Sequence, residues 1–481
     1  MNYPMIGYII GNLLKVEAGL LLLPSLVVIL YREDTLPAFG ITILILLALG
    51  LPLSWKKPEN HGVHVRDGLF TVGLSWILLS VFGALPFVLS GEIPHFVDAF
   101  FETVSGFTTT GSSILTDVEA MSHGLLFWRS FTHWVGGMGV LVFVLAILPR
   151  TSAQTFHIMK AEMPGPTCDK LVGKVRHTAM LFYSIYLVMT IVLIVLLVAG
   201  GMPVFDSMLH AFGTAGTGGF GIKATSVAFY DSAYIDGVLG IFMILFGINF
   251  NLYYLVLMGK SIDALKSEEL HWYLGIIAVA VGLITIDILP LYGENLLRSF
   301  RYAFFQVSSI ITTTGFTTAD YSTWPIFSQS ILVLIMFAGA MAGSTGGGIK
   351  SSRVAILCKN AVRVLRSMLS PRSVHTLKFE GKPVEAQTLS GVHCYFTVYM
   401  LIFAISVLLI SLDQYDHVSN FTAVTTCLNN VGPALGVCGP LGSFAPFSSF
   451  SKLVLSFDML AGRLELFPLL MLFAPGTYRK H

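Results

Sequence analysis

The chain has 481 residues, of which 54% are hydrophobic and only 11% are charged, and its formal net charge is +1. Soluble domains carry roughly 25% charged residues, so this composition excludes an ordinary soluble protein and indicates a polytopic membrane protein. The five cysteines show no C-x-x-C spacing and the thirteen histidines no H-E-x-x-H pattern, so the sequence gives no support for a metal site made of side chains.

Apolar runs long enough to cross a bilayer, which takes about 20 residues, recur along the whole chain. The first run has no short apolar core followed by a small-residue cleavage site, so we expect a membrane helix there and not a signal peptide. The ten predicted spans cover residues 5–30, 38–54, 68–89, 122–148, 178–200, 234–258, 271–291, 327–357, 390–412 and 448–474.

Four shorter and less apolar segments lie between these spans. With 11 to 15 residues each they are too short to cross a bilayer, so we expect re-entrant half-helices. They are Phe96–Phe107, Val204–Ala215, Leu297–Ile311 and Val418–Leu428.

A Gly-rich element follows each half-helix directly, and the four elements recur roughly every hundred residues, as copies of one membrane hairpin do. Threonine favours extended backbone and glycine permits positive φ, so four such strands can turn their carbonyls toward one axis and replace the water around a cation. The sequence therefore predicts a cation-binding filter made of Thr109, Thr110, Gly111, Thr217, Gly218, Gly219, Thr313, Thr314, Gly315, Asn430, Val431 and Gly432.

The predicted fold is an all-α polytopic membrane protein with a leading helix pair at residues 1–66. Four channel-like helix–half-helix–loop–helix repeats follow, in a pseudo-fourfold arrangement around one pore, because non-helical backbone at membrane depth needs protein or a water-filled cavity around it. The predicted repeats cover residues 67–177, 178–270, 271–389 and 390–481, and the third contains an intramembrane gate loop.

The basic residues predict the orientation. Most of the 28 Lys and Arg residues fall in the inter-span segments 55–67, 150–177, 259–270, 350–389 and 475–481. The positive-inside rule places these segments and both chain ends in the cytoplasm, so the Gly-rich loops open outward. Acidic residues in the outer segments would raise the cation concentration at the mouth, unless they are merely solvated loop residues. The basic segment after residue 350 would suit anionic lipid or an acidic partner, although the topology alone explains it as well.

The loops and their flanks, such as Phe107–Gly111 and Ile310–Phe316, resemble the superfamily of potassium transporters that includes TrkH, TrkG, KtrB and plant HKT proteins. The leading helix pair and three further stretches narrow the resemblance to the bacterial TrkH/TrkG branch: Trp134–Gly139, Asn429–Pro433 and Gly462–Glu465. The resemblance implies that each repeat is similar to one potassium-channel subunit. It also implies that Gly111, Gly219, Gly315 and Gly432 line the filter, where glycine in all four places goes with potassium preference.

Two repeats depart from a symmetric filter. The second has Gly216 and Gly218 where the first and third have threonine, and the fourth has Asn430 and Val431. The expected ligands are backbone carbonyls, so four unequal strands can still form a ring. The sequence differences between the repeats nevertheless predict a looser filter than that of a potassium channel. They leave open whether the filter strongly prefers potassium over sodium.

Residues 337–350 contain five glycines within a spanning run, and each glycine costs a helix roughly 1 kcal/mol relative to alanine. A phosphate-binding loop is excluded because Ile349, and not lysine, follows Gly348. The resemblance implies a gate below the filter, and a kink for close helix packing is the alternative. The predicted gate residues are Gly343, Ser344, Thr345, Gly346, Gly347, Gly348 and Lys350.

Arg463 lies near the middle of the last predicted span, where a charge costs at least about 2.5–3.5 kcal/mol and should face the interior or water. The resemblance implies that it forms an electrostatic constriction in the pore below the filter. The alternative is an internal ion pair with Asp458 or Glu465.

Together these features predict potassium uptake across a bacterial inner membrane, not enzymatic activity. The chain is expected to bind neither a cofactor of its own nor nucleic acid. K⁺ is expected only as the transported ion. The resemblance implies a homodimer in the lipid bilayer with a cytosolic, nucleotide-binding regulatory subunit of the TrkA type. A transporter coupling K⁺ to H⁺ or Na⁺ stays open, with Asp287 and Asp458 as the mid-span acids to test, as does a poorly selective K⁺/Na⁺ pathway.

Overall fold

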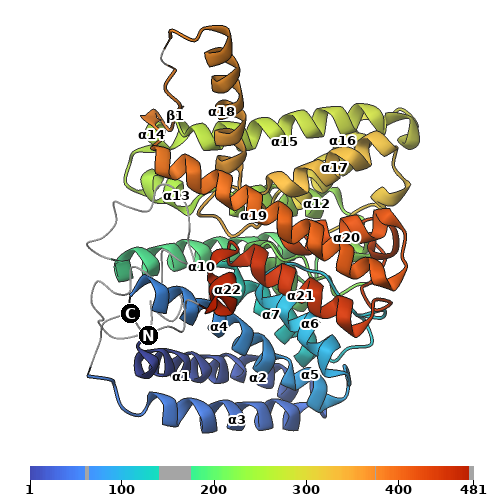
Figure 1. Ribbon diagram of the computed structural model, residues 1–481. Helices are drawn as coiled ribbons and strands as arrows, with labels where there is room; N and C mark the ends of the chain where they lie inside the picture. Colours follow the sequence, from blue (N-terminus) through green and yellow to red (C-terminus); the bar gives the residue numbers. More distant parts are fainter. Residues whose placement is uncertain (60–63, 140–174, 374, 476–481) are drawn as a thin grey trace.

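The computed structural model describes residues 1–59, 64–139, 175–373 and 375–475. Long helices lying side by side dominate it (Figure 1). Six of the described helices are long and apolar enough to cross a membrane, or seven if one sharply bent pair counts as a span. The chain is thus the all-α, multi-pass membrane protein that its composition predicts.

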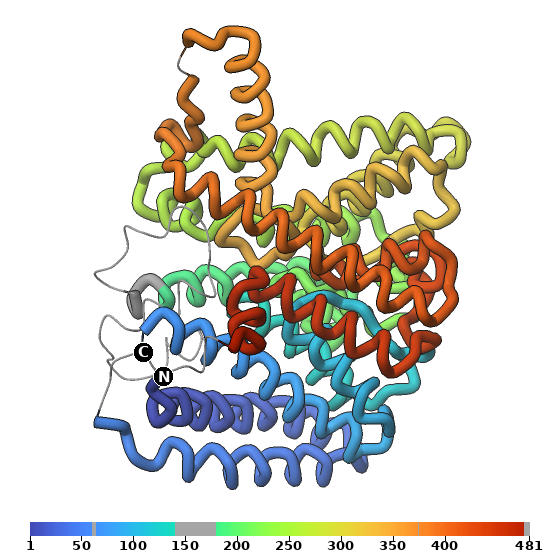
Figure 2. Tube along the Cα trace, in the orientation of Figure 1, coloured from blue at the N-terminus to red at the C-terminus, as the bar shows by residue number. Residues whose placement is uncertain are grey.

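The leading span consists of α1 (Tyr3–Leu20) and α2 (Leu22–Tyr31), and α3 (Leu36–Ser54) runs back along it. A Cβ atom on Gly11 would lie 2.9 Å from the carbonyl oxygen of Gly50, so a small residue is required where α1 crosses α3. These helices form one edge of the molecule (dark blue in Figure 2), opposite the projecting helix α18 (Ser351–Leu369, orange).

Four groups of helices follow. The first contains α4 (Val65–Gly83), α5 (Leu85–Ser90), α6 (Phe96–Phe107) and α7 (His123–Gly137); the second contains α10 (Val175–Ala199), α11 (Val204–Gly216), α12 (Ala233–Phe246) and α13 (Phe250–Leu257). After α14 (Ser261–Leu265), the third contains α15 (Glu268–Asp287), α16 (Leu296–Ile311), α17 (Ile326–Ala338) and α18; the fourth contains α19 (Ala386–Ile410), α20 (His417–Asn429), α21 (Ser449–Arg463) and α22 (Phe467–Phe473).

Short elements connect these helices. A two-stranded antiparallel hairpin, β1 (Lys378–Phe379) and β2 (Lys382–Pro383), lies between α18 and α19. The 3₁₀ turns are η2 (Ser226–Tyr230), η3 (Leu289–Tyr292), η4 (Tyr321–Thr323), η5 (Ser411–Asp413) and η6 (Gly436–Cys438).

The predicted half-helices are confirmed as α6, α11, α16 and α20, each within one residue of its expected bounds. Three predicted spans are wrong as continuous helices. Residues 234–258 bend by 90° between α12 and α13, residues 327–357 break into α17, a non-helical segment and α18, and residues 448–474 break between α21 and α22. The predicted span 122–148 continues beyond Gly139 outside the described residues.

The breaks follow a common plan, because α7, α12, α17 and α21 are 15, 14, 13 and 15 residues long. Near the ends of two of them a glycine touches the end of a half-helix. A Cβ atom on Gly136 would lie 1.9 Å from the carbonyl oxygen of Phe107, and one on Gly462 would lie 2.1 Å from that of Leu428. In α7 and α21, close contact with a half-helix therefore coincides with the end of the helix.

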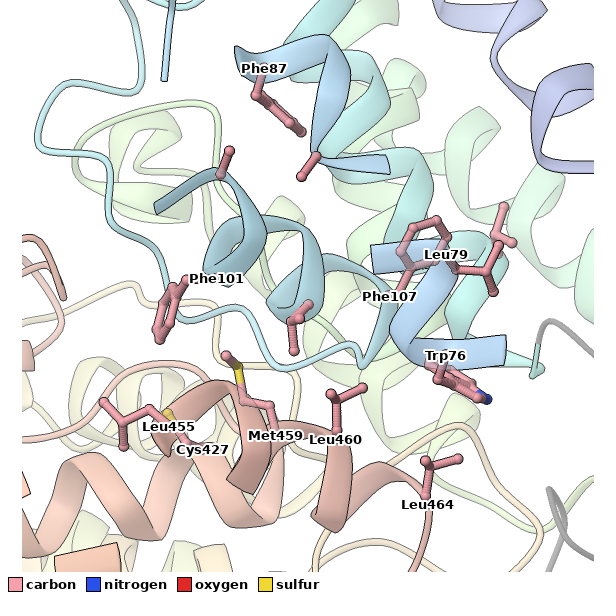
Figure 3. Packing of buried hydrophobic residues seen from close by; sticks show 14 of the residues in the cluster. Trp76, Leu79, Phe87, Phe101, Phe107, Cys427, Leu455, Met459, Leu460 and Leu464 are labelled. Carbon is pink, nitrogen blue, oxygen red and sulfur yellow. The ribbon is translucent and has the colours of Figure 1, made fainter. Parts of the chain in front are cut away.

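One cluster of buried hydrophobic residues joins the first and fourth repeats. Figure 3 shows Trp76 of α4, Phe107 of α6 and Leu460 of α21 among the buried side chains of this cluster. The indole N–H of Trp128 also donates to the carbonyl oxygen of Gly83 at 3.0 Å. Since lipid is as apolar as these side chains, close packing supplies the stabilisation, and it fixes α6 against α21.

Candidate ion pathway

The four Gly-rich loops, though far apart in sequence, meet in one closed ring. A Cβ atom on Gly111 would lie 2.0 Å from the carbonyl oxygen of Gly218, and one on Gly219 would lie 1.7 Å from that of Thr314. The first loop thus contacts the second, and the second contacts the third, at distances that exclude any side chain.

The ring closes through the other two loops. A Cβ atom on Gly315 would lie 2.2 Å from the carbonyl oxygen of Val431, and one on Gly432 would lie 2.8 Å from that of Thr110. We call the four strands 109–111, 217–219, 313–315 and 430–432 the glycine ring. The structure brings together all twelve residues predicted from the sequence for the filter.

The four strands share one backbone conformation despite their different sequences. Thr109, Thr217, Thr313 and Asn430 have φ between 56° and 60°, and the glycine two residues later has φ between 71° and 105°. Residues other than glycine seldom adopt these left-handed backbone angles, so their recurrence at the same position shows that the four loops are structurally equivalent. The departures in the second and fourth repeats therefore leave the backbone of the ring intact.

Each half-helix ends where its strand begins, at Phe107, Gly216, Ile311 and Asn429. Helix C-termini carry partial negative charge from their unpaired carbonyl groups. Four such ends beside one ring favour a cation there.

A cavity of about 160 Å³ opens on one side of the ring and is lined by all four ring glycines. Arg129 and Lys223 also line it, and no acidic residue is among its described lining residues. Two of the acids expected at the mouth form ion pairs: Glu102 binds Arg129 at 2.6 Å and Asp98 binds Lys452 at 2.6 Å.

In the first and third repeats, threonine hydroxyls brace the strand. The hydroxyls of Thr108 and Thr110 lie 2.8 Å apart, and those of Thr312 and Thr314 are also 2.8 Å apart. This matching pair of hydrogen bonds makes these two repeats near-twins, as their sequences suggest.

In the second repeat, His133 of α7 occupies the space that threonine would need. A Cβ atom on Gly218 would lie 2.3 Å from its imidazole ring, and one on Gly216 would lie 2.2 Å from its carbonyl oxygen. The ring Nδ1 of His133 lies 2.8 Å from the carbonyl oxygen of Gly106, and its Nε2 accepts the N–H of Phe220 at 3.3 Å. No sequence signal marked His133, because its partners lie in two other segments.

In the fourth repeat, Asn430 bridges elements from different repeats. Its side-chain amide donates to the hydroxyl of Thr110 and to the carbonyl oxygen of Met459, both at 2.9 Å. A threonine has no group that reaches both acceptors. The asparagine therefore ties the fourth strand to the first strand and to α21.

The non-helical segment 339–350, which we call the intramembrane loop, lies against the third and fourth strands of the ring. The N–H of Gly347 donates to the hydroxyl of Thr313 at 2.7 Å, and a Cβ atom on Gly347 would lie 2.5 Å from the carbonyl oxygen of Asn429. The side chain of Lys350 folds back and donates to the carbonyl oxygen of Gly346. The predicted gate residues thus occupy the space next to the ring.

The same loop accounts for the bend between α12 and α13. The N–H of Met341 donates to the carbonyl oxygen of Gly247 at 3.1 Å, and the N–H of Phe250 donates to that of Gly343 at 3.0 Å. Backbone groups freed by a helix break at membrane depth need partners within the protein. The helix of the second repeat can bend between α12 and α13 because the intramembrane loop of the third repeat forms hydrogen bonds with the backbone groups freed at the bend.

Arg463, the last residue of α21, connects the intramembrane loop to the end of α7. Its guanidinium donates to the carbonyl oxygen of Thr345 at 2.7 Å, to that of Gly137 at 2.6 Å and to that of Gly136. A second cavity, of about 50 Å³, is lined by Arg463, Lys350 and residues of the loop. The negative end of α7 therefore stabilises the positively charged guanidinium of Arg463 and holds it next to the intramembrane loop.

The acids considered as ion-pair partners of Arg463 make other contacts. Glu465 forms an ion pair with Arg353, and Asp458 accepts a hydrogen bond from the hydroxyl of Ser406 at 2.7 Å. Asp287, expected in the middle of a span, is the last residue of α15 and accepts the hydroxyl of Ser328 at 2.6 Å. Neither Asp287 nor Asp458 lines either of the two cavities, which disfavours them as coupling groups.

Comparisons with known proteins agree with this architecture. A family model described as TrkH, cation transport protein, matches residues 35–279 and 294–478. The chain is 37% identical to the Trk system potassium uptake protein TrkH of Salmonella typhimurium over 100% of both chains. It is 33% identical to TrkG of Escherichia coli K12, over 99% of this chain and 98% of that one. The crystal structure of the potassium transporter TrkH from Vibrio parahaemolyticus matches with a TM-score of 0.90 and 32% identity over the full length of both.

Proposed function

The chain belongs to the TrkH family of cation transport proteins, and we propose that it carries potassium ions into a bacterial cell as the membrane component of a Trk-type uptake system. The observation that carries this proposal is the closed glycine ring, which has a cavity on one side and the intramembrane loop on the other.

In this proposal an ion leaves the outer cavity and sheds water in the ring, where inward carbonyls replace its hydration shell. The carbonyl ends of the four half-helices favour the positive charge. The membrane potential drives the ion inward with about 2.3 kcal/mol per charge for every 100 mV. The twelve ring residues are the proposed potassium ligands, through backbone oxygens.

The intramembrane loop is the proposed gate. It contacts Thr313 of the ring and, through Thr345, the guanidinium of Arg463. Conduction would require the loop to leave this position, and Arg463 would act as an electrostatic constriction beside it.

We further propose a bacterial inner-membrane location with both chain ends in the cytoplasm, a homodimer and a cytosolic nucleotide-binding subunit that controls the gate. The basic residues of the inter-span segments support this orientation. The relatives' names, which call them components of a Trk system, support the existence of partners.

The test is rubidium and potassium uptake in cells that lack their own potassium uptake systems, with and without a co-expressed cytosolic subunit. The expected result is growth at low potassium and rubidium uptake that depends on this chain. A well-folded protein in the membrane that supports neither growth nor uptake under both conditions would refute the proposal.

A further inference from the structure

Two consecutive glutamates at the start of α15 point to different parts of the protein. Glu268 accepts hydrogen bonds from the side chain of Lys359 in α18 and, at 3.1 Å, from the N–H of Glu380 in the hairpin. Glu269 is 6% exposed, and its carboxylate faces the intramembrane loop. Successive helix residues lie about 100° apart around the axis, so one helix turn reaches both the hairpin and the loop.

Glu269 holds both flanks of the intramembrane loop with one oxygen atom. Its Oε1 accepts the N–H of Ala342 at 2.7 Å and the N–H of Ser352 at 3.1 Å. Ala342 lies near the start of the loop and Ser352 in the first turn of α18, immediately after it. Charge-assisted bonds of this kind are stronger than those between neutral groups.

The hairpin is attached to the same helix end. Glu380 and Gly381 form its two-residue turn, both with positive φ, which suits a tight hairpin turn. The Oε1 of Glu380 accepts the hydroxyl of Ser267 at 2.8 Å and the N–H of Glu269 at 3.0 Å. The turn of the hairpin therefore caps the N-terminus of α15, next to the residue that holds the loop.

We propose that Glu269 is the positioning residue that keeps the intramembrane loop in its closed place, and that the hairpin turn at Glu380 transmits the action of the cytosolic subunit to it. This inference rests on the proposed function of the loop as a gate and on the proposed control by a cytosolic subunit. A displaced hairpin would withdraw the cap of α15, shift Glu269 and release both N–H groups that hold the loop.

Rubidium flux into liposomes containing the purified full-length protein tests the first part. Without the cytosolic subunit, Glu269→Ala should raise the basal flux about tenfold, which corresponds to a shift of about 1.4 kcal/mol in the gating equilibrium. Glu269→Gln should leak less than Glu269→Ala, because it retains the accepting oxygen but loses the charge that strengthens both hydrogen bonds. Glu269→Asp, shorter by one methylene, should be leaky and serves as the second variant if the alanine variant is unstable.

The selectivity for rubidium over sodium should be unchanged in all three variants, because the glycine ring is untouched; a variant that merely disturbs the fold would also change selectivity. Glu385→Ala, which removes an exposed acid just before α19, is the matched control and should behave as wild type. Wild-type basal flux in both Glu269→Ala and Glu269→Asp would overturn the proposal, as would a Gln variant as leaky as Ala.

The second part predicts that Glu380→Ala, which removes the cap of α15, raises the basal flux and so lowers the response to the cytosolic subunit, measured as the ratio of flux with and without it. A full response would overturn the role of the hairpin. If the wild type itself carries no rubidium under any condition, the proposed function fails. If the wild type does carry it and the Glu269 variants gate normally, only this inference fails.

Discussion

The N–H of Gly347 donates a hydrogen bond of 2.7 Å to the side-chain hydroxyl of Thr313, and this bond joins the intramembrane loop directly to the third strand of the glycine ring. The proposed gate and the proposed filter are thus neighbouring parts of one structure. Thr313 is buried and has a left-handed backbone, so its hydroxyl is held in place to receive this N–H.

Replacing Thr313 by valine keeps the shape of the side chain and removes the acceptor. An N–H left unpaired in a buried place costs about 1–3 kcal/mol, and here the cost falls on the closed state. We expect a basal rubidium flux in liposomes several-fold above wild type.

Thr109→Val is the matched control for this variant, because the hydroxyl of Thr109 donates to the carbonyl oxygen of Thr108 within its own strand at 2.7 Å. It changes the equivalent position of the first repeat and leaves the loop contact intact. Equal flux in the two variants would contradict a special link between Thr313 and the gate.

Arg463 should limit conduction through its charge. Arg463→Met removes the charge, and with it both the repulsion of an approaching cation and the hydrogen bond to Thr345. We expect maximal rubidium flux to rise about fivefold, the effect of about 1 kcal/mol. Arg463→Lys keeps the charge and should stay near wild type; if it conducts as well as the methionine variant, the electrostatic role is refuted.

Gly111→Ser should reduce the preference for potassium over sodium. A Cβ atom there would lie 2.0 Å from the carbonyl oxygen of Gly218, so the second strand must move and the ring must change its shape. The measurement is the inhibition of rubidium uptake by sodium, which we expect to become stronger.

Gly91→Ser controls for backbone strain in that experiment. Gly91 has a φ of 80°, close to the 85° of Gly111, but a Cβ atom on it would meet nothing within 4 Å. Its selectivity should equal that of the wild type. An unchanged preference in Gly111→Ser would show that this glycine does not line the filter.

The buried pair Glu102–Arg129 should stabilise the side of the ring that faces the cavity of about 160 Å³. Glu102 also accepts the N–H of Ile114 at 2.9 Å, and Arg129 donates to the carbonyl oxygen of Gly221 at 2.9 Å, so the pair connects the segments that follow the first two strands. Arg129→Met leaves a buried carboxylate unpaired, at a cost of about 3–5 kcal/mol.

We expect a marked fall in the thermal unfolding midpoint of Arg129→Met in detergent. The ion pair Lys223–Glu119 gives the comparison, because its side chains are 25% and 43% exposed. Exposed pairs contribute about 0–1 kcal/mol, so Lys223→Met should leave the midpoint nearly unchanged. Similar midpoints for the two variants would contradict the structural role of the buried pair.

The fold was largely predictable because membrane helices follow from the length of apolar runs, and the half-helices from their shortness between such runs. The breaks within three spans were not, apart from the Gly-rich run after Ala338. A bend such as that at Gly247 is tolerated only because the intramembrane loop, about a hundred residues later, bonds to the freed backbone.

The sequence by itself determined that this is a membrane protein with four equivalent Gly-rich loops, because composition and spacing are properties of the linear chain. Only the tertiary structure decided which loop contacts which, why Gly218 replaces a threonine beside His133, and which acid binds the intramembrane loop. These answers depend on contacts such as that between Glu269 and Ala342, 73 residues apart. Local sequence patterns do not predict such pairs, because the residues around each partner give no information about a residue that is distant in sequence.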